Sequence, residues 1–490
     1  MSAHHFLAFD LGAESGRTIL GKLEGDRIVT RELTRFSNGP VRVLGHLHWN
    51  IYNLFEEVKK GMKACLEEAD IRPEALAVDT WGVDFGFLAR DGSILGFPFA
   101  YRDGRTKGAM EGFFERIPRE KIYQITGIQF LPFNTLFQLY ALVRDKSPLL
   151  EHIAGLLFMP DLFNYLLTGE KVSEFTMAST SQLLDPSRGT WNEELFAALE
   201  ISPAIMQDVL SPGTAIGALS PAVSQEMDLE ETLVIATASH DTAAAIAAIP
   251  ASGTNWAYIS SGTWSLMGVE AARPIINTKA LDANFTNEGG VSGTIRFLKN
   301  IAGLWLLQQC RKEWAKTAAL TYEELTRLAE EAPSFKSFVD PDWPGFLNPP
   351  SMPDAIRQFC LKTGQKPPLT VPEFVRCILE SLALKYRLTL NRLRQLTETP
   401  IERIHVIGGG SRNQLLCQMT ADAAGVPVVA GPAEATAIGN IMVQALALGY
   451  VQSLDDIRKI IRNSIALRNY EPSGVKEWDL AVERYRELLD

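Results

Sequence analysis

The stretch Asp10-Leu11-Gly12-Ala13-Glu14-Ser15-Gly16-Arg17 follows the apolar residues 6–9 and leads into an alternating segment at 17–23. Two such runs around a short glycine-containing turn predict antiparallel strands. Backbone N–H groups exposed in a turn of this kind can bind phosphate oxygens. No GxxxxGK[ST] pattern occurs, and residues 17–23 have a strand pattern where a dinucleotide-binding turn needs a helix. The turn is therefore a phosphate loop between two strands or a plain hairpin.

The second half of the chain repeats this arrangement. Residues 256–260 and 264–270 have strand patterns and flank the turn Ser261-Gly262-Thr263, which indicates an internal duplication. Taken singly, each turn is more simply a plain turn. Taken together, they favour a strand-turn-strand phosphate site of the actin-like ATPase kind.

A third glycine turn lies near the C-terminus. Residues 404–407 form a strand pattern, and Gly408-Gly409-Gly410 then leads into a helix predicted over 413–424. Consecutive glycines let a flat ligand lie against the backbone, and a helix N-terminus favours anions. Residues 431–440, followed by a further helix, are a candidate lining of the same pocket. The alternative is an ordinary helix entry.

The remaining pattern predicts an α/β chain of two domains. After the first two strands we expect a third at 27–31, a helix over 51–69 and a strand at 76–79. We also expect a hairpin over 85–95 around Asp91-Gly92, a strand at 233–237 and helices over 243–248 and 374–393. The boundary is expected near 250–253, giving domains 1–249 and 250–490.

Composition limits the classes of function. The chain has 490 residues, 47 Lys+Arg against 58 Asp+Glu, a formal charge of -11, and 46% hydrophobic against 21% charged residues. This is a globular composition. The acidic balance and the lack of a basic run argue against nucleic acid or anionic membranes as partners. We find no signal peptide and no membrane span, and the five scattered cysteines suit a reducing cytoplasm. A monomer is the default expectation.

Asp241 is the candidate for proton transfer. It stands in Ser239-His240-Asp241-Thr242, after the strand at 233–237, where open α/β sheets bind ligands. One interpretation is a general base; the other is the N-cap of the helix over 243–248, a common use of aspartate. His240 beside it either contacts a polyol or packs in the core.

These motifs together resemble the FGGY carbohydrate kinases, over nearly the whole chain, and within them the branch that phosphorylates L-rhamnulose. The segments that carry the resemblance are 10–17, 79–85, 101–103, 127–135, 239–242, 260–268, 287–290, 298–307 and 408–410. The phosphate turns are shared by all actin-like ATPases, whereas 79–85 and 239–242 together are more specific.

The resemblance implies two ribonuclease-H-like domains, an N-terminal one for sugar and a C-terminal one for nucleotide, with the substrates in an interdomain cleft. It implies Asp241 as catalytic base and Asp10 as a magnesium ligand through water. The matching ATP positions are Ala13, Glu14, Ser15, Gly16, Arg17, Thr263, Gln308 and Gly409. The matching sugar positions are Gly82, His240, Asp241, Thr242 and Asn300.

The implied reaction is transfer of the γ-phosphoryl group of ATP to O1 of L-rhamnulose, in the breakdown of L-rhamnose. Trp81, Phe85 and Phe87 are candidates for an apolar wall around the methyl group of this deoxy sugar, and otherwise are core aromatics. Glu14 departs from the family, which more often has a small polar residue there, so its carboxylate must point away from the phosphates. A kinase for another ketose or polyol, and a non-enzymatic actin-like protein, are the alternatives.

Overall fold

The computed structural model describes residues 3–316, 319–397 and 399–489. By its internal contacts the chain divides into two compact units. The first unit contains residues 1–252, 270–297 and 435–464, and the second contains 253–269, 298–434 and 465–490. The chain therefore leaves the first unit and returns to it twice. The expected domains 1–249 and 250–490 were defined by the ligand that each half binds, sugar or nucleotide. That division stays a prediction.

The first unit is built on a six-stranded sheet of order β13-β14-β6-β1-β2-β3. Strands β1, β2 and β3 are antiparallel neighbours, and β6 and β14 run parallel to β1. This confirms the predicted meander and the returning strand. The strands of the sheet are β1 (Ala3–Leu11), β2 (Ser15–Glu24), β3 (Arg27–Ser37), β6 (Ala75–Thr80), β13 (Thr214–Ala218) and β14 (Leu233–Ala236).

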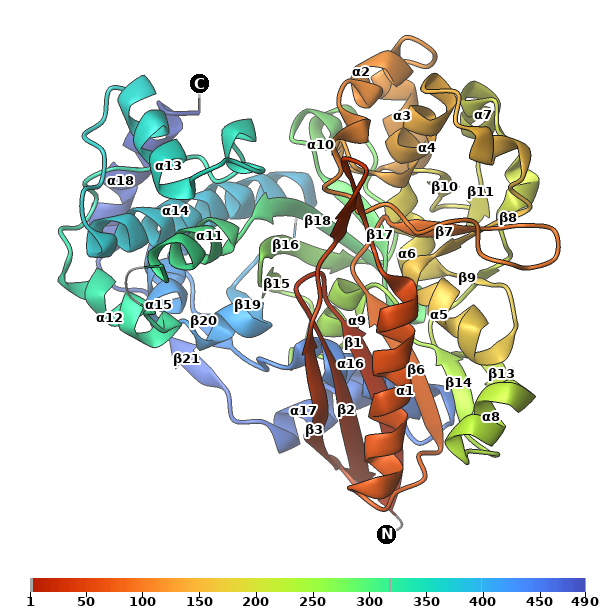
Figure 1. The fold of residues 1–490 in the computed structure, drawn as a ribbon. Helices are drawn as coiled ribbons and strands as arrows, with labels where there is room; N and C mark the ends of the chain where they lie inside the picture. The colour runs from red at the N-terminus through yellow and green to blue at the C-terminus, as the bar shows by residue number, and fades with distance from the viewer. Residues whose placement is uncertain (1–2, 317–318, 398, 490) are drawn as a thin grey trace. The chain divides into compact units, whose positions relative to one another are not determined.

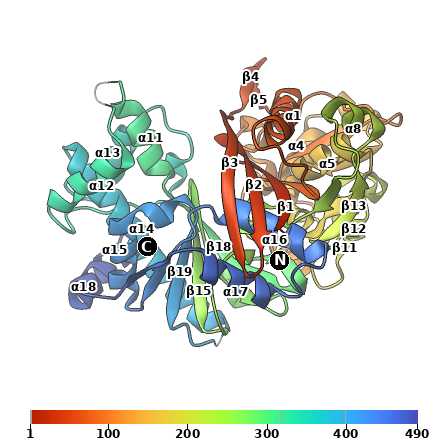
Figure 2. The same ribbon diagram turned by 90° about the horizontal axis from the view of Figure 1, so that it is seen from below.

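Helices cover both faces of this sheet. Helix α1 (Ile51–Glu67) crosses one face, and α16 (Ala435–Ala447) lies on the other beside α9 (Asp241–Ala247) (Figures 1 and 2). The predicted face of α1, namely Leu54, Val58, Met62 and Cys65, is buried against Leu7, Phe9 and Leu11 of β1. Alternation along β1 sends every second side chain to this face, so the strand and the helix share one apolar core.

The other elements of the first unit are short. Its helices are α2 (Ala109–Phe114), α3 (Arg119–Thr126), α4 (Thr135–Arg144), α5 (Met159–Thr168), α6 (Phe175–Ala178), α7 (Glu193–Leu199), α8 (Pro221–Met227), α10 (Thr278–Asp282) and α17 (Leu454–Ser464). Its other strands are β4 (Val41–Val43), β5 (His46–His48), β7 (Phe85–Leu88), β8 (Gly155–Phe158), β9 (Ser173–Glu174), β10 (Leu184–Asp185), β11 (Thr190–Trp191), β12 (Val209–Leu210) and β17 (Thr286–Gly289).

The predicted hairpin over 85–95 is present, and its first arm has a second partner. The turn at Asp91-Gly92 is present, since the N–H of Gly92 donates to the carbonyl of Ala89 at 3.0 Å. Across the turn, the N–H of Ala89 donates to the carbonyl of Ser93 and the N–H of Leu95 donates to the carbonyl of Phe87, both at 2.8 Å. The first arm forms β7, which also pairs along its length with β8. The turn motif predicts this local pairing but not the second, distant partner of β7.

The second unit repeats the strand order of the first. Its strands belong to a sheet of order β17-β18-β16-β15-β19-β20-β21. Five strands of each sheet can be numbered 1 to 5 along the chain, and both sets then lie in the order 3-2-1-4-5: β3-β2-β1-β6-β14 in the first sheet and β18-β16-β15-β19-β20 in the second. In both sheets, strand 1 is antiparallel to strand 2 and parallel to strand 4. This confirms the predicted duplication. The strands are β15 (Trp256–Ser261), β16 (Trp264–Ala271), β18 (Ile295–Ala302), β19 (Arg403–Ile407), β20 (Val428–Ala430) and β21 (Arg468–Tyr470).

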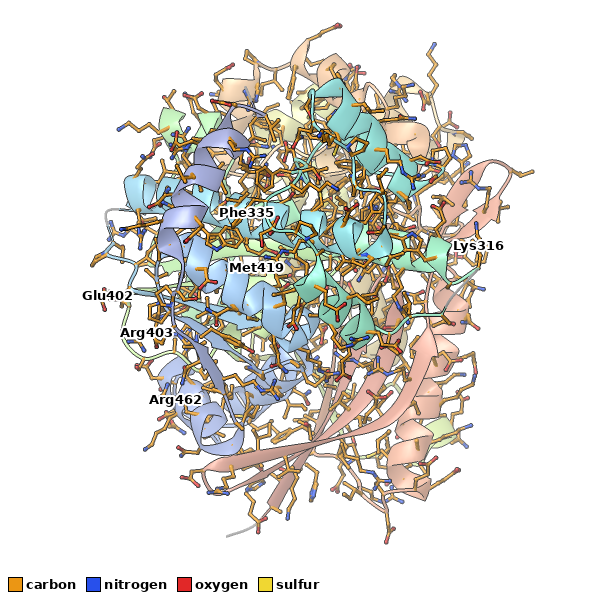
Figure 3. All side chains as sticks on the ribbon, turned by 90° about the vertical axis from the view of Figure 1, so that its left-hand side faces the viewer. Lys316, Phe335, Glu402, Arg403, Met419 and Arg462 are labelled. Carbon is orange, nitrogen blue, oxygen red and sulfur yellow. The ribbon has the colours of Figure 1, made fainter. Side chains whose placement is uncertain are left out.

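The second unit also contains helices, of which the one over Val371–Thr397 is the longest. They are α11 (Trp305–Trp314), α12 (Tyr322–Glu331), α13 (Met352–Lys362), α14 (Val371–Thr397), α15 (Gln414–Ala424) and α18 (Val475–Arg486). Phe335, labelled in Figure 3, packs edge-on against Trp478 of α18 with 5.0 Å between ring centroids. The five cysteines are buried free thiols. Within the described residues, no helix combines the length and apolar character needed to cross a bilayer.

Candidate active site

Asp241 is the first residue of α9, directly after the loop that follows β14. The helix is capped by His240, so the N-cap interpretation of Asp241 is wrong by one position. Its Oδ1 accepts hydrogen bonds from the N–H of Thr242 at 2.5 Å and from Thr242 Oγ1 at 3.0 Å. Among the described residues, the hydrogen bonds to this carboxylate end on Oδ1, and about a third of the side chain (32%) is exposed. Oδ2 is thus available to a substrate.

The surroundings of Asp241 make it a better base than an ordinary carboxylate. Removal from bulk water, together with the negative charge of Asp10, raises the pKa of Asp241 to about 7. Burial and the neighbouring Asp10 also raise the pKa of Asp79 well above its usual range. A carboxylate with a pKa near the working pH is largely ionised there and is also a stronger base than a carboxylate with an ordinary pKa.

A buried network fixes the loop that carries Asp241. The N–H of Ser239 donates to Glu174 Oε2 at 3.1 Å, and the N–H of His240 donates to Thr176 Oγ1 at 3.1 Å. Glu174 also accepts from the first N–H groups of α6, at Thr176 and Met177. Because Glu174 is wholly buried, removal from water raises its pKa to about 7. The backbone direction at residues 239–241 is therefore set by a remote segment of the chain.

His240 lies between Asp241 and a buried ion pair. Its Nε2 is 3.4 Å from Asp241 Oδ1, and its Nδ1 is 3.2 Å from Arg296 Nη2 and 3.5 Å from Glu288 Oε2. Gly82 adjoins the ring, because a Cβ added there would lie 3.3 Å from His240 Nε2. The structure therefore brings together the predicted sugar residues Gly82, His240, Asp241 and Thr242.

The segment containing Gly82 is held by one aspartate. Asp84 Oδ2 accepts from Trp49 Nε1 at 2.7 Å, from Trp81 Nε1 at 2.9 Å and from the N–H of Tyr101 at 3.0 Å. Trp81 also packs on Trp49 with 4.1 Å between ring centroids. This arrangement explains why an aspartate stands among aromatic residues in an otherwise apolar segment.

The turn between β1 and β2 has the expected form. The N–H of Gly12 donates to the carbonyl of Ser15 at 2.9 Å, and Asp10 and Arg17 face each other across the two strands. Arg17 Nη2 lies 2.5 Å from Asp10 Oδ2. Glu14 at the tip is exposed. The predicted ATP-binding residues 13–17 thus form one side of this turn. The ion pair between Asp10 and Arg17 lies where the two strands meet the turn.

Asp10 is also the expected magnesium position. The described residues contain no cluster of three or more His, Cys, Asp or Glu arranged as a metal site built from protein alone. Magnesium in phosphoryl-transfer sites usually keeps several waters and takes one or two carboxylates besides phosphate oxygens. The carboxylate of Asp10, whose charge acts on Asp79 and Asp241, fits that mode of binding as a single protein ligand.

The second unit gathers three predicted nucleotide positions. The N–H groups of Gly303 and Trp305 donate to the carbonyl of Thr263 at 3.1 and 3.2 Å, which joins this turn to the start of α11, where Gln308 lies. The third position is on the glycine turn after β19, described next. Asn300, the remaining predicted sugar residue, is half-buried on β18 of the same unit.

The glycine turn lies directly against Ser261. Gly408 has φ +78°, and a Cβ on Gly410 would lie 2.0 Å from Ser261 Oγ, so neither position accepts a larger residue without a shift. A Cβ on Gly409, by contrast, would meet no atom within 4 Å. The predicted nucleotide residue of this turn is therefore the one that borders open space.

Two residues of the site were missed by sequence reasoning, Glu174 and Arg296. Both side chains are fully buried. Arg296 had a signal, because it stands in the apolar run Ile295-Arg296-Phe297-Leu298, and a charged residue inside a buried strand must be paired. Glu174 had no such signal in the sequence, because a single glutamate before a short helix ordinarily serves as its cap.

Comparison with known proteins decides the family. Residues 5–248 match the N-terminal domain, and 257–448 the C-terminal domain, of the FGGY family of carbohydrate kinases. The chain belongs to this family. Enzymes of this kind transfer a phosphoryl group from ATP to a sugar hydroxyl, so the protein is a carbohydrate kinase.

The similar proteins extend over the full length. The chain is 47% identical to a rhamnulokinase of Bacteroides thetaiotaomicron, with 99% of each chain covered. It is 41% identical to one of Pectobacterium carotovorum, covering 100% of this chain and 97% of the other. A gluconate kinase structure from Lactobacillus acidophilus superposes with a TM-score of 0.80 at 17% identity, covering 99% and 98% of the two chains. The structural likeness confirms the two-domain α/β fold.

Proposed function

We propose that the protein phosphorylates L-rhamnulose at O1, with ATP as donor, in the breakdown of L-rhamnose. The observation that carries the proposal is Asp241, a carboxylate with pKa about 7 and one oxygen left for a substrate. The names of full-length relatives at 41% and 47% identity support the choice of sugar. We propose residues 1–249 as the sugar-binding half, 250–490 as the nucleotide-binding half, and a monomer acting in the cytoplasm.

In this mechanism Asp241 accepts the proton of the O1 hydroxyl as O1 attacks the γ-phosphorus of ATP. The bond from O1 to phosphorus forms, the bond to the β-phosphate oxygen breaks, and ADP leaves. We propose Gly82, His240, Thr242 and Asn300 as sugar contacts. The proposed ATP contacts are residues 13–17, Thr263, Gln308 and Gly409. Magnesium, held by Asp10 through water, would neutralise charge on the phosphate oxygens when bound.

The choice of sugar is tested with a panel of substrates. In a coupled assay of ADP release across ketoses and polyols, we expect the highest kcat/KM for L-rhamnulose. L-Fructose is the matched comparison, because it differs only by a hydroxyl in place of a hydrogen on C6. We expect it to be worse by about tenfold or more, if an apolar wall such as Trp81, Phe85 or Phe87 faces that carbon. A better kcat/KM for another ketose or a polyol would assign the enzyme to that sugar instead.

The role of Asp241 predicts the pH profile. A general base works only when ionised, so kcat/KM should rise with pH through about 7 and level off above it. An unperturbed aspartate would place this acidic limb near its ordinary value of 3.8. The measurement is kcat/KM for the sugar from pH 5 to 9 with saturating ATP and coupling enzymes in excess. A profile that is flat across this range would exclude Asp241 as the ionising base.

A further inference from the structure

Arg296 binds three different partners through its guanidinium group. This residue on β18 is fully buried, and its Nε donates to the carbonyl of Gly289 at 2.6 Å. Its Nη1 lies 3.1 Å from Glu288 Oε2, and its Nη2 lies 3.2 Å from His240 Nδ1. The planar group is thereby locked on three sides, and one of its N–H groups is directed at the imidazole.

This contact determines which nitrogen of His240 carries the proton. A guanidinium group only donates hydrogen bonds and keeps its charge at any working pH. The nitrogen that faces it must therefore accept, so Nδ1 has no proton. In a neutral ring the proton is then on Nε2, which lies beside Gly82 and Asp241.

We propose that Arg296 is a positioning residue that holds His240 as the neutral Nε2–H tautomer, so that the ring donates to a sugar oxygen beside Asp241. The inference rests on the proposed sugar-binding role of His240. Because the ring is already neutral, it has no acidic proton to pass to Asp241. Asp241 is then the group at this place that takes up the proton of the sugar hydroxyl.

The charges around His240 support this assignment. Glu288 and Arg296 face Nδ1 from β17 and β18, and Asp241 faces Nε2 from α9. Glu174 accepts from the backbone N–H of Ser239, the residue before His240, and the charges of Asp10 and Asp79 act on Asp241. Burial, followed by the charge of Arg296, lowers the pKa of His240 well below its usual range. Without Arg296, Glu288 would face Nδ1 alone and would favour a proton there.

The direct test is nitrogen NMR of the full chain with ¹⁵N-labelled histidine. The wild-type signal of His240, assigned by its loss in His240→Gln, should show an unprotonated Nδ1 and a protonated Nε2 throughout pH 5 to 8. In Arg296→Gln, Nδ1 should become protonated and the ring should titrate within this range. The double variant Arg296→Gln with Glu288→Gln is the matched control, in which Nδ1 should no longer be driven to carry a proton.

Kinetics give a second readout. Arg296→Gln should raise KM for the sugar about tenfold or more and shift the pH profile, because the donor on Nε2 is no longer fixed. In the His240→Gln variant the glutamine amide N–H replaces Nε2–H. Adding Arg296→Gln to this variant should therefore raise KM for the sugar much less than it does in the wild type. A wild-type ring protonated on Nδ1 would overturn the proposal. So would an equal rise in KM on Arg296→Gln in the wild type and in His240→Gln. The NMR measurement needs neither sugar nor turnover. It therefore tests the tautomer of His240 even if L-rhamnulose is not the substrate.

Discussion

Replacing Asp241 with asparagine should lower kcat by about 100-fold or more while sugar binding survives. Asparagine keeps the size and the acceptor oxygen that Thr242 uses, but it cannot take up the proton of the attacking hydroxyl. We expect calorimetry to give a sugar affinity within a few fold of the wild type. Near-normal turnover would remove Asp241 from the mechanism.

Stability separates this loss from a folding defect. The pKa of Asp241 is raised in the folded chain, so its ionised form costs stability as pH rises above the ordinary value of 3.8, with the full cost reached above about 7. The asparagine variant should therefore unfold at the same or a higher temperature at pH 8. Asp208→Asn, a change at an exposed aspartate, is the matched control and should alter neither kcat nor the unfolding temperature.

Gly439→Ala should lower the stability of the first unit. In α16 an added Cβ would lie 1.8 Å from the carbonyl oxygen of Ala244 in α9. A backbone atom cannot rotate away, so the two helices must separate, and overpacking of this kind costs about 1–3 kcal/mol or more. The gain in helix propensity from alanine, about 1 kcal/mol, offsets only part of that cost. Because Asp241 begins α9, we also expect kcat to fall.

Differential scanning calorimetry and kcat measure both effects of Gly439→Ala. With two units, the unfolding temperature of each transition is the quantity to compare, since a single free energy of unfolding is not defined. Gly39→Ala is the matched control, because a Cβ there would meet no atom within 4 Å. Unchanged transitions in the Gly439 variant would show that α9 and α16 are not in close contact.

The fold was predictable where local pattern and tertiary pairing agree. The three strands β1 to β3 are neighbours in sequence and in the sheet, so alternation and a turn were enough to predict them. The hairpin around Asp91-Gly92 was predictable for the same reason, whereas the second partner of β7 was not, because β8 begins at Gly155, far along the chain from that turn. Short-range patterns carry no information on such distant partners.

The site was predictable to the same extent. Asp241 stood at the end of a strand, where parallel sheets bring loops together, and the glycine turns have a recognisable composition. Glu174 and Arg296 act from elements that only the folded chain brings to residues 239–241. The environment that raises the pKa of Asp241 is likewise a product of folding, because it arises from burial and from Asp10, distant in sequence.

The late return of α16 to the first unit has a consequence for synthesis on the ribosome. Gln444 donates to the carbonyl of Leu7 at 3.1 Å, Ile441 fills the space over Gly21, and Asn440 donates to Asp79 at 2.6 Å. These partners are translated more than 350 residues after the strands that they cover. During synthesis, one face of the amino-terminal sheet therefore stays uncovered until residues 435–447 have been translated.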